Sequence, residues 1–208
     1  MTLMDTPIRN IIFDMGKVLI RFEPDHFLDR AGIVNLEDRK LLKKEIYESP
    51  MWTQMDMGIL DEEGMIDKVR PVLPEHLQKY TETLIAGWCE PIEMVVGMKD
   101  LIFELKEKGY GIFLLSNASR MQKEYWKQVD CSSCFDGTVV SAFEGVMKPD
   151  KKIYEILLER CHLKAEECLF IDDRKANVDT AVFLDMTGYV FDGDAERLRF
   201  FLQKHGIL

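Results

Sequence analysis

Short apolar runs alternate with helical patterns along most of the chain. The runs predict buried strands at residues 9–14, 111–115, 138–140, 168–171 and 189–191. Between the strands, apolar side chains recur at helical spacing, as in residues 98–105, where they occupy positions i, i+3, i+4 and i+7. Further helices are expected at 119–128, 153–161, 175–185 and 195–204. Strands separated by helices predict an α/β fold with a Rossmann-like, mostly parallel sheet and helices on both faces.

One long segment, residues 23–92, interrupts this alternation and contains no strand-like run. Three helical patterns fill it, and they begin at Asn35, Asp61 and Pro74. We therefore expect a small all-helical part inserted after the first strand. The α/β core would then consist of residues 1–22 and 93–208.

Length and composition fit a globular protein without a nucleic-acid or membrane partner. Of the 208 residues, 47% are hydrophobic and 31% are charged. There are 27 Lys and Arg and 37 Asp and Glu, which gives a net charge of −10. Such an acidic surface repels nucleic-acid phosphates and anionic lipids. The five cysteines have no framework spacing, and Met1–Asp5 does not resemble the start of a secretory leader. We expect a cytoplasmic protein without a transmembrane helix, either a monomer or a homodimer.

Polar residues that can carry chemistry follow the predicted strands. They are Asp14 and Gly16 after the first strand, Ser116 and Asn117 after the second, Asp172 and Asp173 after the fourth, and Lys148 just before a helix. Because ligands bind at the carboxyl ends of parallel strands, we expect these groups to meet at one edge of the sheet. Carboxylates from separate strands suit Mg²⁺ with room for water and phosphate. Ser116 and Lys148 could hold phosphate oxygens while one aspartate attacks phosphorus.

Each of these residues also has a purely structural explanation. A single Asp at a strand end commonly forms a turn or caps a helix. Lys148 stands in a Lys-Pro-Asp sequence that is typical of a loop before a helix. It is the combination, in this order and at these strand ends, that favours phosphate chemistry.

Four segments resemble the four motifs of the haloacid dehalogenase superfamily. They are residues 11–20 (IIFDMGKVLI), 114–117 (LLSN), 148–149 (KP) and 170–177 (FIDDRKAN). The resemblance implies a haloacid-dehalogenase-like core, and the helical insertion fits the cap of that superfamily. Residues 49–52 and 58–63 resemble cap sequence of a sugar-phosphate phosphatase subgroup, which includes bacterial α-D-glucose-1-phosphate phosphatase and the N-terminal phosphatase domain of soluble epoxide hydrolase. The implied function is Mg²⁺-dependent hydrolysis of a small phosphorylated metabolite, with a sugar phosphate favoured.

The resemblance also implies a role for each motif residue. Asp14 would be the nucleophile that forms an aspartyl-phosphate. Mg²⁺ would be bound by Asp14, the main-chain carbonyl of Gly16 and Asp173, with Asp172 as a ligand or as an orienting neighbour. The groups expected to act on the phosphoryl group or to support the site are Ser116, the Asn117 amide, Lys148 and Asn177.

Gly16 departs from the family pattern, because most phosphatases of the superfamily carry there a second aspartate that serves as general acid and base. Its loss typically costs about 10²- to 10⁴-fold in rate. One explanation is a leaving group that needs little protonation, or a substitute acid among Glu23, Asp25 and His26. A second is a metal-independent 2-haloacid dehalogenase, against which the metal-binding pair Asp172-Asp173 argues. The third is a non-catalytic binding or regulatory protein.

Overall fold

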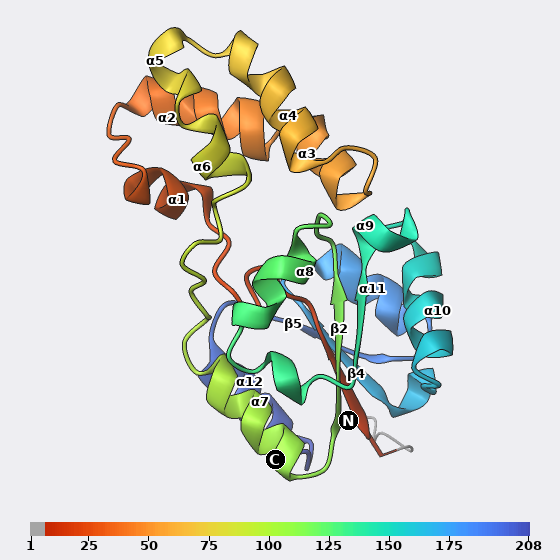
Figure 1. Ribbon diagram of the computed structural model, residues 1–208. Helices are drawn as coiled ribbons and strands as arrows, with labels where there is room; N and C mark the ends of the chain where they lie inside the picture. The colour runs from red at the N-terminus through yellow and green to blue at the C-terminus, as the bar shows by residue number, and fades with distance from the viewer. Residues whose placement is uncertain (1–6) are drawn as a thin grey trace.

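Five parallel strands form the sheet of the computed structural model, which describes residues 7–208 (Figure 1). Their order across the sheet is β3-β2-β1-β4-β5. The strands are β1 (Asn10–Phe13), β2 (Gly111–Ser116), β3 (Gly137–Val140), β4 (Cys168–Asp172) and β5 (Thr187–Val190). In the central strand, Ile12 pairs with Phe113 of β2 on one side and with Phe170 of β4 on the other. The predicted α/β fold with a parallel sheet is confirmed.

Helices cover both faces of this sheet, because alternate side chains of the buried strands point to opposite sides. Ile11 and Phe13 belong to one hydrophobic cluster, on the side of α7 (Met98–Glu107) and α12 (Ala195–Lys204). Ile12 belongs to a second cluster, on the side of the remaining large helices, α10 (Lys151–Arg160) and α11 (Lys175–Phe183). With both faces buried, the strands place their carboxyl ends rigidly.

Residues 23–92 form a group of helices beyond the carboxyl ends of the strands (Figure 1). We call this group the cap. Its helices are α1 (Pro24–Arg30), α2 (Leu36–Leu42), α3 (Pro50–Asp56), α4 (Glu62–Val69), α5 (Glu75–Gln78) and α6 (Thr81–Ile85), with a π-helical turn at Lys43–Tyr47 and a 3-10 turn at Arg70–Val72. Asn35 and Asp61 cap α2 and α4 through their side-chain oxygens, as predicted. The helix expected after Pro74 is divided into α5 and α6. The domain boundaries themselves stay a prediction.

The two connections between core and cap run side by side. Ile20 and Met94 form an isolated antiparallel bridge. The Arg21 amide donates to the Glu93 carbonyl at 2.7 Å, and the Val95 amide donates to the Leu19 carbonyl at 2.9 Å. The cap is therefore joined to the core by two hydrogen-bonded segments that lie next to the end of β1.

Three core elements differ from the sequence prediction. The helix expected at 119–128 is only α8 (Gln122–Tyr125) followed by a 3-10 turn at Trp126–Gln128. A short helix, α9 (Ser141–Glu144), follows β3 and was not predicted. β5 begins two residues and ends one residue earlier than expected, because its register is set by pairing with β4, Leu169 opposite Thr187, rather than by its half-exposed side chains.

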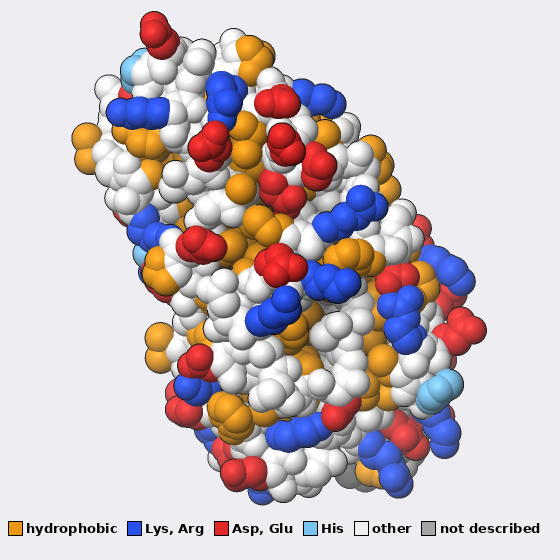
Figure 2. Space-filling view, viewed as in Figure 1, with side chains coloured by type: hydrophobic (Ala, Val, Ile, Leu, Met, Phe, Trp, Pro, Cys, Tyr) orange, Lys and Arg blue, Asp and Glu red, His pale blue; other side chains and the backbone are white. Residues whose placement is uncertain are grey.

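The surface in Figure 2 shows acidic side chains gathered over the cap. A separate hollow of the cap is lined by Asp61, which caps α4, by Glu62, Glu63 and Asp67 of α4, and by Glu82 of α6. Within residues 7–208, no helix has the length and apolar character needed to cross a membrane. The Met1–Asp5 segment, on which the expectation of no leader rests, lies outside the described residues.

Candidate active site

A cavity of about 390 Å³ lies between the carboxyl ends of the strands and the cap. The side that we call the floor comes from the core, with Asp14, Gly16, Asn117, Lys148, Asp173 and Asn177. The opposite side comes mostly from the cap, with Tyr47, Trp52, Asp56, Glu62 and Trp88. The structure thus brings most of the predicted site residues together at one edge of the sheet, facing a space that the cap closes.

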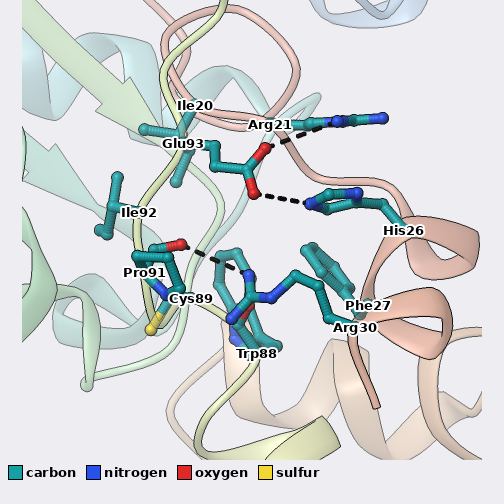
Figure 3. A pocket seen from close by; sticks show the side chains of 10 residues that line it. All are labelled: Ile20, Arg21, His26, Phe27, Arg30, Trp88, Cys89, Pro91, Ile92 and Glu93. Carbon is teal, nitrogen blue, oxygen red and sulfur yellow. Dashed lines mark hydrogen bonds and ion pairs between the residues drawn. The ribbon is translucent and has the colours of Figure 1, made fainter. Parts of the chain in front are cut away.

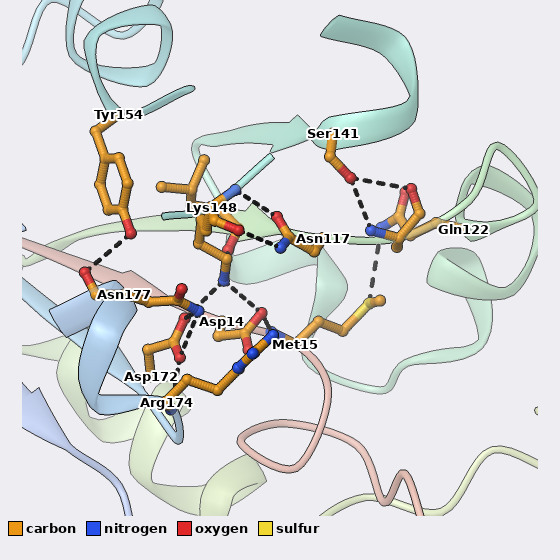
Figure 4. A network of polar contacts seen from close by, with 12 residues as sticks. Asp14, Met15, Asn117, Gln122, Ser141, Lys148, Tyr154, Asp172, Arg174 and Asn177 are labelled. Carbon is orange, nitrogen blue, oxygen red and sulfur yellow. Dashed lines mark hydrogen bonds and ion pairs between the residues drawn. The ribbon is translucent and has the colours of Figure 1, made fainter. Parts of the chain in front are cut away.

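Lys148 is the centre of a buried polar network on the floor (Figure 4). Its Nζ lies 2.8 Å from Asp14 Oδ1, 2.7 Å from Asp172 Oδ2 and 2.7 Å from the Leu115 carbonyl oxygen. These three acceptors match the three hydrogens of the ammonium group. One buried cation therefore joins the ends of β1, β2 and β4.

Asp14 is buried beside this cation, and only one of its oxygens is engaged. Oδ1 accepts from the Met15 amide at 2.7 Å as well as from Lys148. No hydrogen bond to Oδ2 occurs among residues 7–208. A carboxylate held through one oxygen and open at the other has the arrangement that a nucleophile requires.

Asp172 and Asp173 have different surroundings although they are adjacent. Asp172 is fully buried, and its two oxygens accept from the Arg174 amide at 2.8 Å, from Asn177 Nδ2 at 2.9 and 3.0 Å, and from Lys148. Asp173 is half-buried and lines the cavity. Oxygens of Asp14, Asp172 and Asp173 lie within 4.8 Å of one another. This set of hard oxygen donors, joined by the nearby Gly16 backbone, fits a divalent cation such as Mg²⁺.

Ser116 and Asn117 end β2 in different ways. Ser116 is fully buried, its hydroxyl has no hydrogen-bond partner within the described part of the chain, and it is not among the cavity-lining residues. Asn117 Nδ2 donates to the Lys148 carbonyl at 2.9 Å, and the Lys148 amide donates to Asn117 Oδ1 at 2.8 Å. The Asn117 side chain therefore holds the lysine loop, while Ser116 carries an unused polar group, which is costly in a protein interior.

Burial dominates the electrostatics of the floor. It raises the pKa of Asp14, an effect that Lys148 opposes and Asp172 reinforces. Burial also disfavours the Lys148 ammonium, but attraction from Asp14 and Asp172 outweighs it and raises the pKa of Lys148. Burial and the neighbouring Asp172 raise the pKa of Asp173. Three carboxyl groups beside one lysine leave an excess of negative charge, which a divalent cation would neutralise.

Aromatic rings cover much of the cavity above the floor. We define the aromatic wall as Phe22, Tyr47, Trp52, Trp88 and Tyr125, all of which line the cavity. Ring centroids are 4.9 Å apart for Phe22 and Trp88, 5.1 Å for Tyr47 and Trp52, and 5.5 Å for Trp88 and Tyr125. These separations are typical of packed aromatic pairs, so the wall is a preformed apolar surface.

The residues suggested as substitutes for the missing acid are not among those that line this cavity, and Figure 3 shows one of them, His26, turned toward Glu93. His26 Nε2 lies 2.8 Å from Glu93 Oε1 at the connection between core and cap. Glu23 pairs with Arg21 at 3.0 Å. The remaining candidate, Asp25, pairs with Arg39 and Lys43 at 2.9 and 3.0 Å. His26 and Asp25 belong to α1, whereas Glu23 precedes it and lines a separate hollow with Lys17 and Asp173. The structure therefore does not support any of the three as the acid of this cavity.

Two acidic residues of the cap line the cavity and were missed by the sequence analysis. Asp56 is the last residue of α3, and Glu62 is the first residue of α4. The signal for α3 was present, since Ser49 caps the helix and Pro50 is its first residue. The position of the two carboxyl groups over the floor follows only from how the cap packs on the core.

Comparison with known proteins places the fold and the site in context. The family of haloacid dehalogenase-like hydrolases matches residues 8–185. A sesquiterpene phosphatase of Aspergillus oryzae is 29% identical over 188 residues, covering 89% of this chain and 90% of its own. A D-ribitol-5-phosphate phosphatase of Bacteroides thetaiotaomicron is 22% identical over 180 residues, covering 82% and 85%.

The fold is also shared with solved structures. A haloacid dehalogenase family enzyme of Bacteroides thetaiotaomicron, in complex with magnesium and inorganic phosphate, superposes with a TM-score of 0.66 at 21% identity, covering 92% of this chain and 98% of its own. A dehalogenase superposes with a TM-score of 0.68 at 17% identity, covering 87% and 83%. The same fold therefore occurs in a family enzyme solved with magnesium and inorganic phosphate and in a protein named a dehalogenase.

Proposed function

Because the chain belongs to the haloacid dehalogenase-like hydrolases, we propose that it is a Mg²⁺-dependent phosphomonoesterase that acts through an aspartyl-phosphate at Asp14. One observation carries this proposal. Asp14 is held through Oδ1 by Lys148 and the Met15 amide, at a cavity floor where three aspartate carboxylates lie together. Catalysis of phosphoryl transfer depends mainly on positioning the reacting groups and stabilising charge, and this floor offers groups for both.

Asp14, the Gly16 carbonyl and Asp173 would hold the Mg²⁺ ion. Asp172, which the sequence also suggested as a ligand, has both oxygens engaged by three donors, so we assign it to positioning Lys148 and the loop around Asn177. When bound, the cation supplies neutralising charge for the phosphoryl oxygens and for Asp14.

The chain's own residues account for the transfer. A carboxylate oxygen of Asp14 attacks phosphorus, and the bond from phosphorus to the leaving oxygen breaks. Lys148 favours the ionised form of Asp14 and fixes its direction. A phosphoryl group that reaches the end of β2, beyond the residues that line the cavity, would give the buried hydroxyl of Ser116 the partner that it lacks. Water then attacks phosphorus and releases Asp14 and inorganic phosphate.

For the organic part of the substrate, we propose an alcohol with an extended apolar surface. The aromatic wall lies directly over the floor and would exclude water from such a group. The relative named a sesquiterpene phosphatase supports this class.

A sugar phosphate is the second candidate. Thr53, Lys17 and Arg174 line the same cavity and offer donors for hydroxyl groups, and aromatic rings also accept the apolar face of a sugar ring. The relative named a D-ribitol-5-phosphate phosphatase supports this class.

The experiment is a substrate panel with Mg²⁺, containing farnesyl monophosphate, hexose 1- and 6-phosphates, ribitol 5-phosphate, flavin mononucleotide and a 2-haloacid. Release of phosphate supports the proposal, and the preferred ester decides the class. Reaction in H₂¹⁸O separates the chemistries, because attack on phosphorus labels the released phosphate. Hydrolysis of a dehalogenase-type ester would instead label Asp14. Release of halide, or no reaction with any compound, contradicts the proposal.

A further inference from the structure

Hydrolysis of an alkyl phosphate needs a group that gives a proton to the leaving oxygen and later takes one from water, as a carboxyl group can, and no carboxyl group on the floor is free for this. Gly16 has no side chain. The three hydrogens of Lys148 are bound by three acceptors, and Asp172 accepts from three donors. Asp14 is assigned to nucleophilic attack and Asp173 to the cation. The proton donor must therefore come from the opposite side of the cavity.

Asp56 is the carboxyl group of the cap that is placed for this task. It is half-buried, lines the cavity, and its carboxyl group makes no hydrogen bond or ion pair within residues 7–208. Glu62, the other cap carboxyl in the cavity, accepts a hydrogen bond from the Ser119 hydroxyl. Of the two, only Asp56 presents an unengaged carboxyl group to the substrate space.

The backbone at Asp56 is fastened to the core, close to the phosphoryl side. The Ser141 hydroxyl donates to the Asp56 carbonyl at 2.5 Å and accepts from the Ala118 amide at 3.0 Å. Two residues farther on, Gly58 has φ +68°, and a Cβ there would lie 2.2 Å from the Ala142 carbonyl oxygen. This close backbone contact positions the end of α3 over the loop that follows β2.

We propose that Asp56 is the general acid and base of the reaction, supplied by the cap in place of the residue missing at Gly16. The inference rests on the proposed phosphatase function. In the first step, Asp14 forms a bond to phosphorus, the bond to the leaving oxygen breaks, and the Asp56 carboxyl proton passes to that oxygen, which leaves as the alcohol. In the second step, the Asp56 carboxylate takes a proton from water as the water oxygen bonds to phosphorus and the bond to Asp14 breaks. Asp56 is then protonated again, and inorganic phosphate is released.

The charges around Asp56 support the protonated form. Burial, together with the acidic side chains of Asp14 on the floor and Glu62 on α4, raises the pKa of Asp56 to about 7. The remaining titratable neighbour, Tyr125 of α8, has a pKa that burial raises well above its ordinary value, so it adds no charge. A carboxyl group in these surroundings is shared between acid and base forms near neutral pH, which suits both steps.

The test uses two esters of similar shape, 4-nitrophenyl phosphate and 4-nitrobenzyl phosphate. The phenol leaves without a proton, whereas the benzyl alcohol requires one. For Asp56→Asn we expect kcat/KM to fall by about 10² or more for the benzyl ester, and by no more than about threefold for the phenyl ester. Because the base of the second step is also lost, the phenyl ester should give a burst of one 4-nitrophenol per enzyme before slow turnover.

Glu62→Gln is the matched control: it removes a charge that raises the pKa of Asp56 but keeps the proton donor, so it should cost the benzyl ester far less than the loss of about 10² expected for Asp56→Asn. The retained phenyl ester activity of Asp56→Asn shows that this variant is folded and binds phosphate. Equal losses on both esters without a burst would overturn the role of Asp56. If the wild-type protein releases phosphate from neither ester, the proposed function fails instead, and the two failures are told apart.

Discussion

The floor of the cavity is held together by buried ion pairs, whereas the cap side is held together mainly by packed aromatic rings. On the floor, Lys148, Asp14 and Asp172 are buried and joined by ion pairs of 2.7 to 2.8 Å. On the cap side, packed aromatic rings line the same cavity as the carboxyl group of Asp56, which has no partner within the described chain. The floor is suited to hold one phosphoryl group rigidly, and the cap side to select an organic group and move a proton.

The difference predicts that substitutions on the two sides act differently. A change on the floor leaves a buried charge without compensation, so it should damage folding and chemistry together. A change on the cap side removes contact area or a proton donor, so it should alter which ester is hydrolysed and at what pH. The predictions below test this contrast.

The largest effect is expected for Lys148→Met. The side chain is 1% exposed, and its removal leaves Asp14 and Asp172 facing each other as buried carboxylates. We expect the free energy of unfolding to fall by about 3–5 kcal/mol and phosphate release to be lost. Urea denaturation at pH 7 measures the first and a phosphate assay the second. A stable Lys148→Met variant would show that the floor network is not what holds the three strand ends together.

Trp52→Ala tests the aromatic wall. Trp52 is half-buried, and its ring packs on Tyr47 at 5.1 Å, so its loss should lower the free energy of unfolding less than the loss of a fully buried ring but should open the wall. We expect kcat/KM for farnesyl monophosphate to fall by about 10-fold or more, from the loss of apolar contact worth about 1.5–3 kcal/mol. Activity on 4-nitrophenyl phosphate should change much less. Equal losses on the two esters would mean that the wall supports the fold rather than the choice of substrate.

Gly16→Asp tests whether the two sides can exchange the proton-transfer role. Gly16 has no left-handed backbone, and a Cβ there would lie 3.8 Å from the nearest atom, Cβ of Phe22, so a side chain fits. Introduced into Asp56→Asn, it should raise turnover of 4-nitrobenzyl phosphate by about 10-fold or more. The wild-type background, measured in parallel, should gain little because it already has an acid. A gain of equal size in both backgrounds would argue that Asp56 does not supply the proton.

The smallest effect concerns stability against pH. The pKa of Asp56 is raised to about 7 in the folded protein, so the folded state holds a proton between about pH 4 and pH 7 that the unfolded state has released. The stability contributed by this group is therefore full below about pH 4 and is lost as pH rises through about 7. In EDTA, the free energy of unfolding of Asp56→Asn, taken relative to that of the wild type, should rise by at least about 1 kcal/mol between pH 4 and pH 8. A constant difference across that range would show that the carboxyl group is ordinary.

The floor could be predicted from sequence, because strand ends are where a parallel sheet collects its chemistry. Asp14, Lys148 and Asp173 each stand beside a recognisable strand or helix, and the structure brings them to the same edge. That Asn117 binds phosphate through its amide stays a prediction, and the sequence did not indicate that its side chain holds the Lys148 loop. The local hydrophobic pattern identifies which residue ends a strand, but it does not identify the hydrogen-bond partner of that residue's side chain.

The cap side could not be predicted, because it depends on how separate helices pack. Phe22, Trp52 and Tyr125 come from three distant segments and meet only after the cap has packed against the core. Asp56 does not belong to any motif recognised in the sequence. The candidates for the missing acid, such as His26, were favoured only because they lie close to Asp14 in the sequence. Closeness in sequence is a poor guide where the chain leaves the sheet and enters an inserted group of helices.

The central claim is that Asp14 and a divalent cation together hydrolyse a phosphate ester. It is tested most directly by phosphate release from 4-nitrophenyl phosphate, measured for the wild type and Asp14→Asn, each with Mg²⁺ and with EDTA. We predict release by the wild type with Mg²⁺ only, and a loss on the order of 10³-fold or more in Asp14→Asn. Turnover that persists in Asp14→Asn, or wild-type turnover that is the same in EDTA, would contradict the account.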